Sequence, residues 1–178
     1  METMEKPIKI AITGPESTGK TFLVNHLANK YNGLIVKESA RDYLMDHHNK
    51  YHVTDIYKIG KLQMKQEEAV CRNAKHKQFV FIDTELINIK IWLEYGENRV
   101  QEWILEGIKN TDYDFYFLMY PDISWQADPL REHPDKGLFF FEQFKKNLEE
   151  QKKVYYVIYG SYEERQENAV NIINKLYF

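Results

Sequence analysis

The sequence predicts an α/β fold of three layers, in which helices cover both faces of a five-stranded parallel sheet. Short apolar runs alternate along the chain with longer segments of helical periodicity, as in β–α–β units. The first apolar run, Ile8–Ile12, leads into a glycine-rich loop, Gly14–Thr21, and then into a helical segment, Phe22–Ala28. A strand, a glycine loop and a helix N-terminus in this order form a phosphate-binding site.

The first half of the chain contains five expected elements. They are a strand at 8–13, a helix at 20–29, a short strand at 34–38, a helix at 40–47 and a long helix from about 54 to 75. Gly33 ends the connection before the second strand. Thr54 is expected to cap the long helix, because Asp55 follows in the first turn and basic residues crowd the other end.

The second half begins with Phe79–Ile82, a continuous apolar run typical of a central strand that is buried on both faces. Gly96 stops the helix that follows, and Pro121 ends the next strand. The remaining elements are expected to be helices at 86–95 and 99–108, a strand at 115–120, a helix at 137–152, a strand at 154–159 and a closing helix at 162–176. Strands joined through helical crossovers form a parallel sheet, and ligands bind at the carboxyl ends of its strands.

Length and composition limit the classes of function. The 178 residues are expected to form one domain, 1–178, that is large enough for a hydrophobic core. The formal net charge of −3 argues against a nucleic-acid partner, and the single cysteine, Cys71, excludes a disulfide framework. No apolar signal region opens the chain, and the longest apolar run, 115–120, is too short to span a membrane. We therefore expect a cytoplasmic protein without a membrane partner and, because the glycine loop starts at residue 14, no preceding domain.

The glycine-rich loop matches the P-loop pattern G-x-x-x-x-G-K-[ST]. Its two glycines allow the backbone to wrap around a phosphate group, and its backbone N–H groups then point at the oxygens. Lys20 is expected at the β- and γ-phosphates, and the Thr21 hydroxyl is expected to ligate Mg²⁺. The loop residues expected to bind the nucleoside triphosphate are Gly14, Glu16, Ser17, Thr18, Gly19, Lys20 and Thr21.

Two carboxylates follow the apolar run at 79–82. Asp83 stands at the Walker-B position, where a carboxylate holds Mg²⁺ opposite Thr21. The alternative is that Asp83 caps the helix at 86–95. Glu85 is expected to face a substrate hydroxyl, or else to place a negative charge at the start of that helix.

Charged residues also follow the second strand. A kinase that phosphorylates a hydroxyl group needs a residue that accepts the proton or orients the oxygen. Glu38 ends that strand and is expected in this role, with Asp42 as the alternative carboxylate. Arg41 lies on the same helical face as Glu38 and is expected to pair with it or to contact substrate. The simpler alternative is an exposed Glu–Arg pair without a catalytic role.

The segment 125–137 is polar and irregular, and it follows a strand that should end over the phosphate site. Loops of this length in compact proteins are commonly lids or disordered segments. A lid over a γ-phosphate needs mobile cations, which Arg131 and Lys136 supply. Trp125 is expected to stack on an aromatic ring of the substrate, or else to pack beneath the lid.

The loop after the last strand, Gly160–Arg165, carries two signals. Ser161 and Glu164 form a capping box for the closing helix. The same loop in P-loop kinases borders the adenine, so Gly160 and Ser161 are also expected to contact the nucleotide. The two roles are compatible, because the backbone contacts a base while the side chain caps the helix.

Taken together, these segments resemble the kinase domain of the ribosylnicotinamide kinases, which in many bacteria is the C-terminal part of a multifunctional NAD-biosynthesis regulator. The resemblance covers nearly the whole chain. Its segments are the P-loop, Glu38–Tyr43, Phe81–Glu85, Pro121–Trp125, Asp128–Arg131 and Gly160–Arg165. One departure is Pro129, where the family pattern has glycine, so the lid is expected to open differently.

The resemblance implies the P-loop NTPase and nucleoside kinase fold with a small lid at 125–137, and ATP and Mg²⁺ as cofactors. It also implies that the protein phosphorylates the 5′-hydroxyl of nicotinamide riboside to give nicotinamide mononucleotide, a step of NAD salvage. The adenylyltransferase and DNA-binding domains of the regulators have no counterpart in this sequence, so neither activity is expected. The residues implied in the reaction are Lys20, Thr21, Glu38, Asp42, Asp83 and Arg131.

Two other functions stay open, as does the oligomeric state. The first is a kinase for a different nucleoside or nucleotide, since the acceptor pocket draws on side chains that sequence does not place. A carboxylate-rich pocket formed by Glu38, Asp42, Asp83 and Glu85 would favour a cationic pyridinium nucleoside over neutral ones. The second is an NTPase switch, which needs a water-positioning glutamine after the Walker-B strand, whereas Thr84 and Glu85 follow it here.

Overall fold

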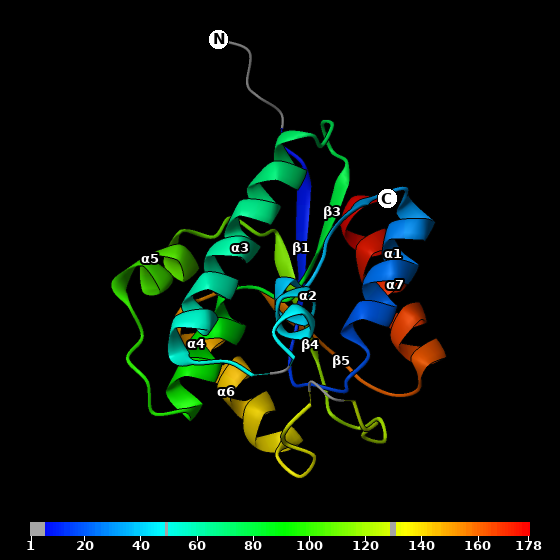
Figure 1. The fold of residues 1–178 in the computed structure, drawn as a ribbon. Helices are drawn as coiled ribbons and strands as arrows, with labels where there is room; N and C mark the ends of the chain where they lie inside the picture. Colours follow the sequence, from blue (N-terminus) through cyan, green and yellow to red (C-terminus); the bar gives the residue numbers. More distant parts are fainter. Residues whose placement is uncertain (1–5, 49, 129–130) are drawn as a thin grey trace.

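The computed structural model describes residues 6–48, 50–128 and 131–178 (Figure 1). Helices and strands alternate along the chain, as the sequence predicts. In chain order the elements are β1 (Ile8–Thr13), α1 (Lys20–Tyr31), β2 (Leu34–Val36), α2 (Ser39–Asp46), α3 (Val53–Arg72), β3 (Phe79–Asp83), α4 (Leu86–Tyr95), α5 (Glu102–Asn110), β4 (Phe115–Met119), α6 (Gly137–Glu150), β5 (Tyr155–Ile158) and α7 (Tyr162–Tyr177).

The five strands form a parallel sheet in the order β2-β3-β1-β4-β5, which confirms the predicted fold class. β1 lies in the centre, with Ile12 opposite Asp83 of β3 and Thr13 opposite Leu118 of β4. The carboxyl ends of the strands therefore meet at one edge of the sheet, at the bottom of Figure 1. The P-loop, α2 and the segment between β4 and α6 come together there, where parallel sheets of this kind bind their ligands.

Helices cover both faces of the sheet and make three layers (Figure 1). α1 and α7 pack on one face, against Ile10 and Ile12 of β1 and the phenylalanines of β3 and β4. α3, α4, α5 and α6 pack on the other face, against Ala11, Val80 and Ile82. Successive side chains of a strand point to opposite faces, so the continuous apolar run of β3 contributes to both cores. Every residue of β3 is buried, as predicted for a central strand.

The starts of α3 and α5 differ from the expectation. α3 has His52 as its N-cap residue, in place of Thr54. The Asp55 carboxylate explains the difference. It accepts a hydrogen bond from the His52 backbone N–H at 2.9 Å, which makes His52 the residue that precedes the first helical turn. α5 begins at Glu102 and not at 99, because the backbone carbonyl of Arg99 accepts a hydrogen bond from a tyrosine of α3 and stays outside the helix.

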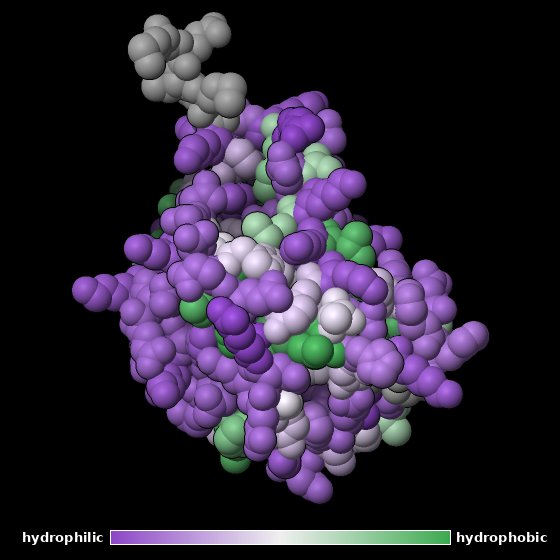
Figure 2. All heavy atoms as spheres, turned by 60° about the vertical axis from the view of Figure 1, so that its left-hand side comes forward, coloured by the Kyte–Doolittle hydropathy of each residue, from purple (hydrophilic) through white to green (hydrophobic). Residues whose placement is uncertain are grey.

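Within the described ranges, no helix combines the length and the apolar character that crossing a membrane requires. The face turned forward in Figure 2 is mostly hydrophilic, and its apolar side chains form small groups. The fully buried apolar side chains belong to the two cores on either side of the sheet.

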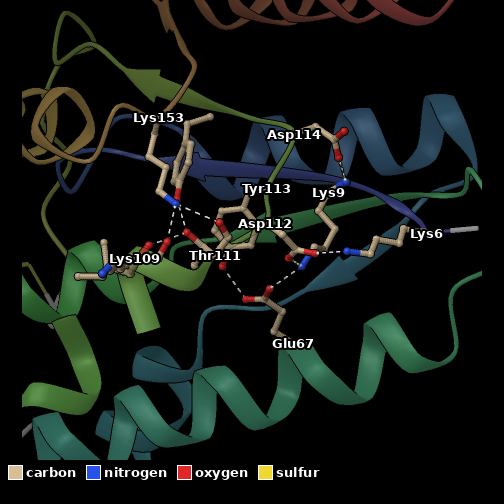
Figure 3. Close-up of polar contacts among 11 residues, drawn as sticks. Lys6, Lys9, Glu67, Lys109, Thr111, Asp112, Tyr113, Asp114 and Lys153 are labelled. Carbon is tan, nitrogen blue, oxygen red and sulfur yellow. Dashed lines mark hydrogen bonds and ion pairs between the residues drawn. The ribbon is translucent and has the colours of Figure 1, made fainter. Parts of the chain in front are cut away.

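A polar cluster lies at the opposite edge of the sheet, where the strands begin (Figure 3). Lys9 of β1 contacts Asp112, and its Nζ lies 3.7 Å from Glu67 Oε1 of α3. The Tyr113 hydroxyl donates to Glu67 Oε2 at 2.6 Å. Burial raises the pKa of Glu67, although the Tyr113 hydrogen bond and the Lys9 charge act in the opposite direction. These contacts join β1, α3 and the loop before β4.

Glu67→Gln is expected to change how stability depends on pH. Because the pKa of Glu67 is higher in the fold than in the unfolded chain, its contribution to stability is full below about pH 4.5 and is lost as the pH rises through the raised pKa. The amide does not ionise, so the melting temperature of the variant should gain on that of the wild type between about pH 4 and about pH 8.

Thermal melts of both proteins across that range measure the effect. Glu68→Gln is the control, because the neighbouring Glu68 side chain is 69% exposed, and its difference from wild type should depend little on pH. A pH-independent difference for Glu67→Gln would contradict the prediction.

Candidate active site

A cavity of about 330 Å³ opens at the carboxyl ends of the strands. The P-loop lines it, together with residues of α2, α4, α6 and the segment after β4. Three of the residues predicted outside the P-loop lie on its wall, namely Glu38, Arg41 and Arg131. The cavity therefore joins elements that are far apart in the sequence around the expected phosphate site.

The P-loop has the close backbone approach that its glycines permit. Gly14 has a φ of 129°, and a Cβ there would lie 2.9 Å from the Met119 carbonyl oxygen. Lys20 Nζ donates to the carbonyl of Gly14 at 2.9 Å and to that of Pro15 at 2.6 Å. Burial lowers the pKa of Lys20, and the charges of Glu38, Asp83 and Glu16 act against that shift. The ammonium group is thus held at the mouth of the loop by backbone carbonyls.

Asp83 and Thr21 form the pair expected for a metal site. The Thr21 hydroxyl donates to Asp83 Oδ2 at 2.6 Å. Asp83 Oδ1 is buried and has no hydrogen-bond partner among the described residues. Burial also raises the pKa of Asp83, against the effects of the Thr21 hydrogen bond and the Lys20 charge. A hydroxyl and a carboxylate with a spare buried oxygen fit Mg²⁺, which prefers oxygen ligands. No group of three or more His, Cys, Asp or Glu suited to a metal occurs in the ranges that the structure describes.

Glu85 differs from the expectation that it faces substrate. It is the N-cap residue of α4, where its carboxylate accepts from the Ile87 backbone N–H at 2.7 Å and from the Thr13 hydroxyl at 3.0 Å. Only 2% of the residue is exposed, and burial raises its pKa to about 7. The reason lies in Thr84, whose φ of 65° turns the chain between the two carboxylates. The capping role therefore belongs to Glu85, and Asp83 is left beside Thr21.

The charged residues after β2 divide between the cavity and the solvent. Glu38 lies on the cavity wall, and burial raises its pKa against the charge of Lys20. Arg41 pairs with Asp128 of the facing segment (Nη2 to Oδ2, 3.2 Å) and not with Glu38. Asp42 is exposed and is not on the cavity wall, because the next step around α2 turns it outward. The structure thus places Glu38, and not Asp42, on the cavity wall, and the role of either carboxylate stays a prediction.

The segment between β4 and α6 lies against the P-loop. Arg131 Nη1 donates to the Ser17 hydroxyl at 3.2 Å and to the Gln126 carbonyl at 2.6 Å. Lys136 does not accompany Arg131, since its Nζ lies over the Tyr95 ring, 4.7 Å from the centroid. The departure from the family pattern at position 129 lies outside the described residues.

Trp125 lies on the wall of a second cavity of about 200 Å³ and not on that of the main one. Its stacking on an aromatic ring of the substrate and its packing beneath the segment both stay predictions. The second cavity shares Glu16 and His133 with the first, so the two are neighbours.

Sequence reasoning missed the aromatic part of the main cavity's wall. We call this part the aromatic chamber, formed by Tyr51, Trp92, Tyr95, Phe140 and Phe144. Trp92 Nε1 donates to the Tyr51 hydroxyl at 3.2 Å, and the two rings meet edge to face at 4.9 Å. The Tyr95 and Phe140 rings lie 5.1 Å apart. The available signal was the helical spacing of residues 88, 91, 92 and 95 on α4, which the sequence alone does not distinguish from a core face.

The loop after β5 has the predicted capping box. Ser161 Oγ accepts from the Glu164 N–H at 3.2 Å, and Glu164 Oε2 accepts from the Ser161 N–H at 2.7 Å. Gly160 and Ser161 are not on the wall of the main cavity, whereas Tyr162 is. A Cβ on Gly19 would lie 2.9 Å from the Tyr162 ring, so this loop packs closely on the P-loop, and its contact with the nucleotide stays a prediction.

Arg165 connects the loop after β5 to the P-loop through its side chain. The residue is only 1% exposed. Its guanidinium contacts Asp122 and donates to the Tyr120 carbonyl at 2.8 Å. It also donates to the Gly160 carbonyl at 2.7 Å and to the Thr18 carbonyl at 3.3 Å. The sequence placed Arg165 within a motif but gave no sign of this role.

A family model described as an AAA domain matches residues 9–165 of the chain. The trifunctional NAD biosynthesis/regulator protein NadR of Salmonella typhimurium (strain LT2) is 30% identical over 124 residues, which make up 68% of this chain and 30% of that protein. The chain therefore spans less than a third of the length of this curated relative.

Solved structures share the fold. A crystal structure of NadR protein in complex with NAD and AMP-PNP has a TM-score of 0.74 at 18% identity, and covers 95% of this chain and 49% of that one. NadR protein in complex with NR gives 0.75 at 18% identity, with 95% and 50% covered. Deoxyadenosine kinase from M. mycoides with bound dATP gives 0.58 at 16% identity, with 94% and 99% covered. At these identities the likeness establishes the fold.

Arg165→Met is expected to destabilise the protein by about 1–3 kcal/mol, because it leaves the carbonyls of Thr18, Tyr120 and Gly160 without the donor that they share. Urea unfolding measures the loss. Lys175→Met, an exposed position on the same helix, is the control and should stay within about 0.5 kcal/mol of wild type. A loss below about 1 kcal/mol for Arg165→Met would mean that the loop and the strand ends hold together without it.

Proposed function

Since the chain belongs to the AAA domain family, we propose that it is an ATP-dependent kinase that phosphorylates the 5′-hydroxyl of nicotinamide riboside. The product is nicotinamide mononucleotide. One observation carries the proposal: a P-loop and an aromatic chamber open into the same cavity, and Glu38 lies on the wall that they share. In this proposal the arrangement would bring a phosphoryl donor site, an acceptor site and a carboxylate into one space.

The donor side of the cavity suits a triphosphate. Backbone N–H groups of the P-loop bind phosphate oxygens, and Lys20 adds a positive charge. Arg131 lies at the mouth of the loop, within reach of Ser17. Phosphoryl transfer depends mainly on positioning and on stabilising charge, and these two cations would do both. The match to NadR in complex with NAD and AMP-PNP supports a nucleotide donor.

Thr21 and Asp83 would hold Mg²⁺ in this proposal. When bound, the ion neutralises charge on the β- and γ-phosphates and orients them. The spare buried oxygen of Asp83 supports the assignment.

The acceptor side suits a flat, positively charged ring. The aromatic chamber contributes five rings to the cavity wall, and a pyridinium cation is attracted to aromatic faces. Glu38 adds a negative charge when it is ionised, and the carbonyl and amide of Asn88, also on the wall, offer hydrogen bonds. The match to NadR protein in complex with NR supports this acceptor.

Glu38 would act on the acceptor hydroxyl. Burial raises its pKa, which makes its carboxylate a better base than an exposed glutamate. The 5′-oxygen attacks the γ-phosphorus, the bond from that phosphorus to the β-phosphate oxygen breaks, and the hydroxyl proton passes to Glu38. ADP leaves with the bridging oxygen.

A kinase for another nucleoside is the second candidate, supported by the likeness to deoxyadenosine kinase over 99% of that chain. It would use the same donor site and the same carboxylate. The two candidates differ only in what fills the aromatic chamber, so a comparison of acceptors separates them.

An acceptor panel tests the proposal. Nicotinamide riboside should give a kcat/KM at least about tenfold above those of uridine, cytidine, thymidine and deoxyadenosine, as a desolvated cation–π contact would provide. The nicotinic acid analogue should also be poor, because its carboxylate is repelled. A neutral nucleoside or a nucleoside monophosphate with the highest kcat/KM would refute the proposed acceptor, and ATP hydrolysis that needs no acceptor would favour a switch.

Trp92→Leu should raise KM for nicotinamide riboside about tenfold and leave KM for ATP unchanged.

Asp83→Asn is expected to lower kcat on the order of 10- to 100-fold and to raise the Mg²⁺ concentration needed for half-maximal rate. The amide oxygen still accepts the Thr21 hydrogen bond, so the melting temperature should change little. Rates measured over a Mg²⁺ titration, with the exposed Asp46→Asn as control, test this. A lower melting temperature with unchanged metal dependence would give Asp83 a structural role instead.

A further inference from the structure

A carboxylate of the P-loop holds the backbone of the segment after β4. Glu16 Oε1 accepts the backbone N–H of His133 at 2.8 Å, and Glu16 Oε2 accepts that of Glu132 at 3.2 Å. Both oxygens of one side chain are thus used on two successive peptide groups. Hydrogen bonds to an ionised acceptor are stronger than neutral ones, so Glu16 joins the loop firmly to the residues that directly follow Arg131.

The next P-loop residue contacts the same segment from its other end. Ser17 Oγ accepts the backbone N–H of Gln126 at 2.9 Å and lies 3.2 Å from Arg131 Nη1. Arg131 also donates to the Gln126 carbonyl. The guanidinium therefore stands between two points of attachment, one at Ser17 and one at Glu16.

Phosphate binding does not require a carboxylate at this position. A P-loop holds phosphate with backbone N–H groups, a lysine and a hydroxyl, and a negative charge in the loop repels the ligand. Glu16 is close enough to Lys20 for its charge to act on that ammonium group. A carboxylate kept in such a place is best explained by a role other than phosphate binding.

We propose that Glu16 is a positioning residue, whose carboxylate fixes the peptide groups of 132 and 133 on the P-loop and so sets where the Arg131 guanidinium meets the transferring phosphate. The inference rests on the proposed phosphoryl transfer. It assigns the P-loop a second task, which is to place the cation of the segment that covers it.

Other contacts keep the segment near the cavity when Glu16 is changed. The Tyr51 hydroxyl donates to Glu132 Oε2 at 3.0 Å, and Arg41 pairs with Asp128. Loss of Glu16 should therefore shift Arg131 and not unfold the protein. A displacement of about 1 Å at a catalytic group can cost on the order of 100-fold in rate.

Kinetics of Glu16→Ala and Glu16→Gln, each made in the wild type and in Arg131→Ala, test the proposal. Glu16→Ala should lower kcat on the order of 10- to 100-fold, and Glu16→Gln should fall between, because its amide keeps one acceptor oxygen. KM for ATP should not rise, since a negative charge near the phosphates has gone. In the Arg131→Ala background, Glu16→Ala should change kcat by less than about twofold, because coupled residues are not additive. Glu106→Gln, an exposed carboxylate on α5, is the control.

Amide hydrogen exchange of residues 132 and 133, measured by NMR without substrate, gives a readout that does not need activity. Exchange should be faster in Glu16→Ala than in wild type. Unchanged exchange would overturn the attachment, and a full additive loss of kcat in the Arg131→Ala background would overturn the action through Arg131. A wild-type protein that phosphorylates no acceptor overturns the proposed function and, with it, the catalytic part of this inference, while the exchange result still decides the attachment.

Discussion

The buried Arg165 guanidinium is the interaction on which the geometry of the candidate site depends. It donates hydrogen bonds to the carbonyl of Thr18 in the P-loop and to carbonyls at the ends of β4 and β5. The Asp122 carboxylate pairs with its positive charge. The P-loop is therefore fixed from behind to the strands whose following loops surround it. Gly14 shows how little space this leaves, since any side chain there would meet the Met119 backbone. A site held in this way needs little rearrangement when charge develops, and such preorganisation is the main source of electrostatic catalysis.

How well the sequence predicts a feature depends on whether its signal is local. The P-loop, the buried β3 run and the capping box of α7 are each encoded within a few neighbouring residues, and each was found. The aromatic chamber was not, because its rings come from separate elements and resemble core residues when they are read one segment at a time. Glu85 and Asp42 point away from the cavity for a related reason. The positive φ at Thr84 changes the direction of the Glu85 side chain, and one further residue along α2 changes that of Asp42. A pattern of residue types does not show these directions.

The two edges of the sheet use charge in different ways. At the edge where the strands begin, Lys9 is half-buried, but its contacts with Asp112 and Glu67 outweigh the effect of burial and raise its pKa. Burial prevails for Glu67 of the same cluster, and at the opposite edge it prevails for both a cation and a carboxylate, so the pKa of Lys20 is lowered and that of Glu38 is raised. The first arrangement pairs opposite charges and joins elements of the fold. The second leaves groups with shifted pKa values beside an open cavity. Perturbed groups of the second kind are typical of sites where chemistry takes place.

The hydrogen bonds that Lys20 makes to the Gly14 and Pro15 carbonyls have a consequence for ligand exchange. An incoming triphosphate does not meet a bare cation; it replaces partners that the lysine already has, so its affinity reflects the difference between two sets of hydrogen bonds. Adenosine, which lacks phosphate oxygens, has nothing to exchange for those carbonyls and should leave the loop unchanged. The same carbonyls offer the lysine partners again once such a ligand departs, so the empty loop leaves no unpaired ammonium group.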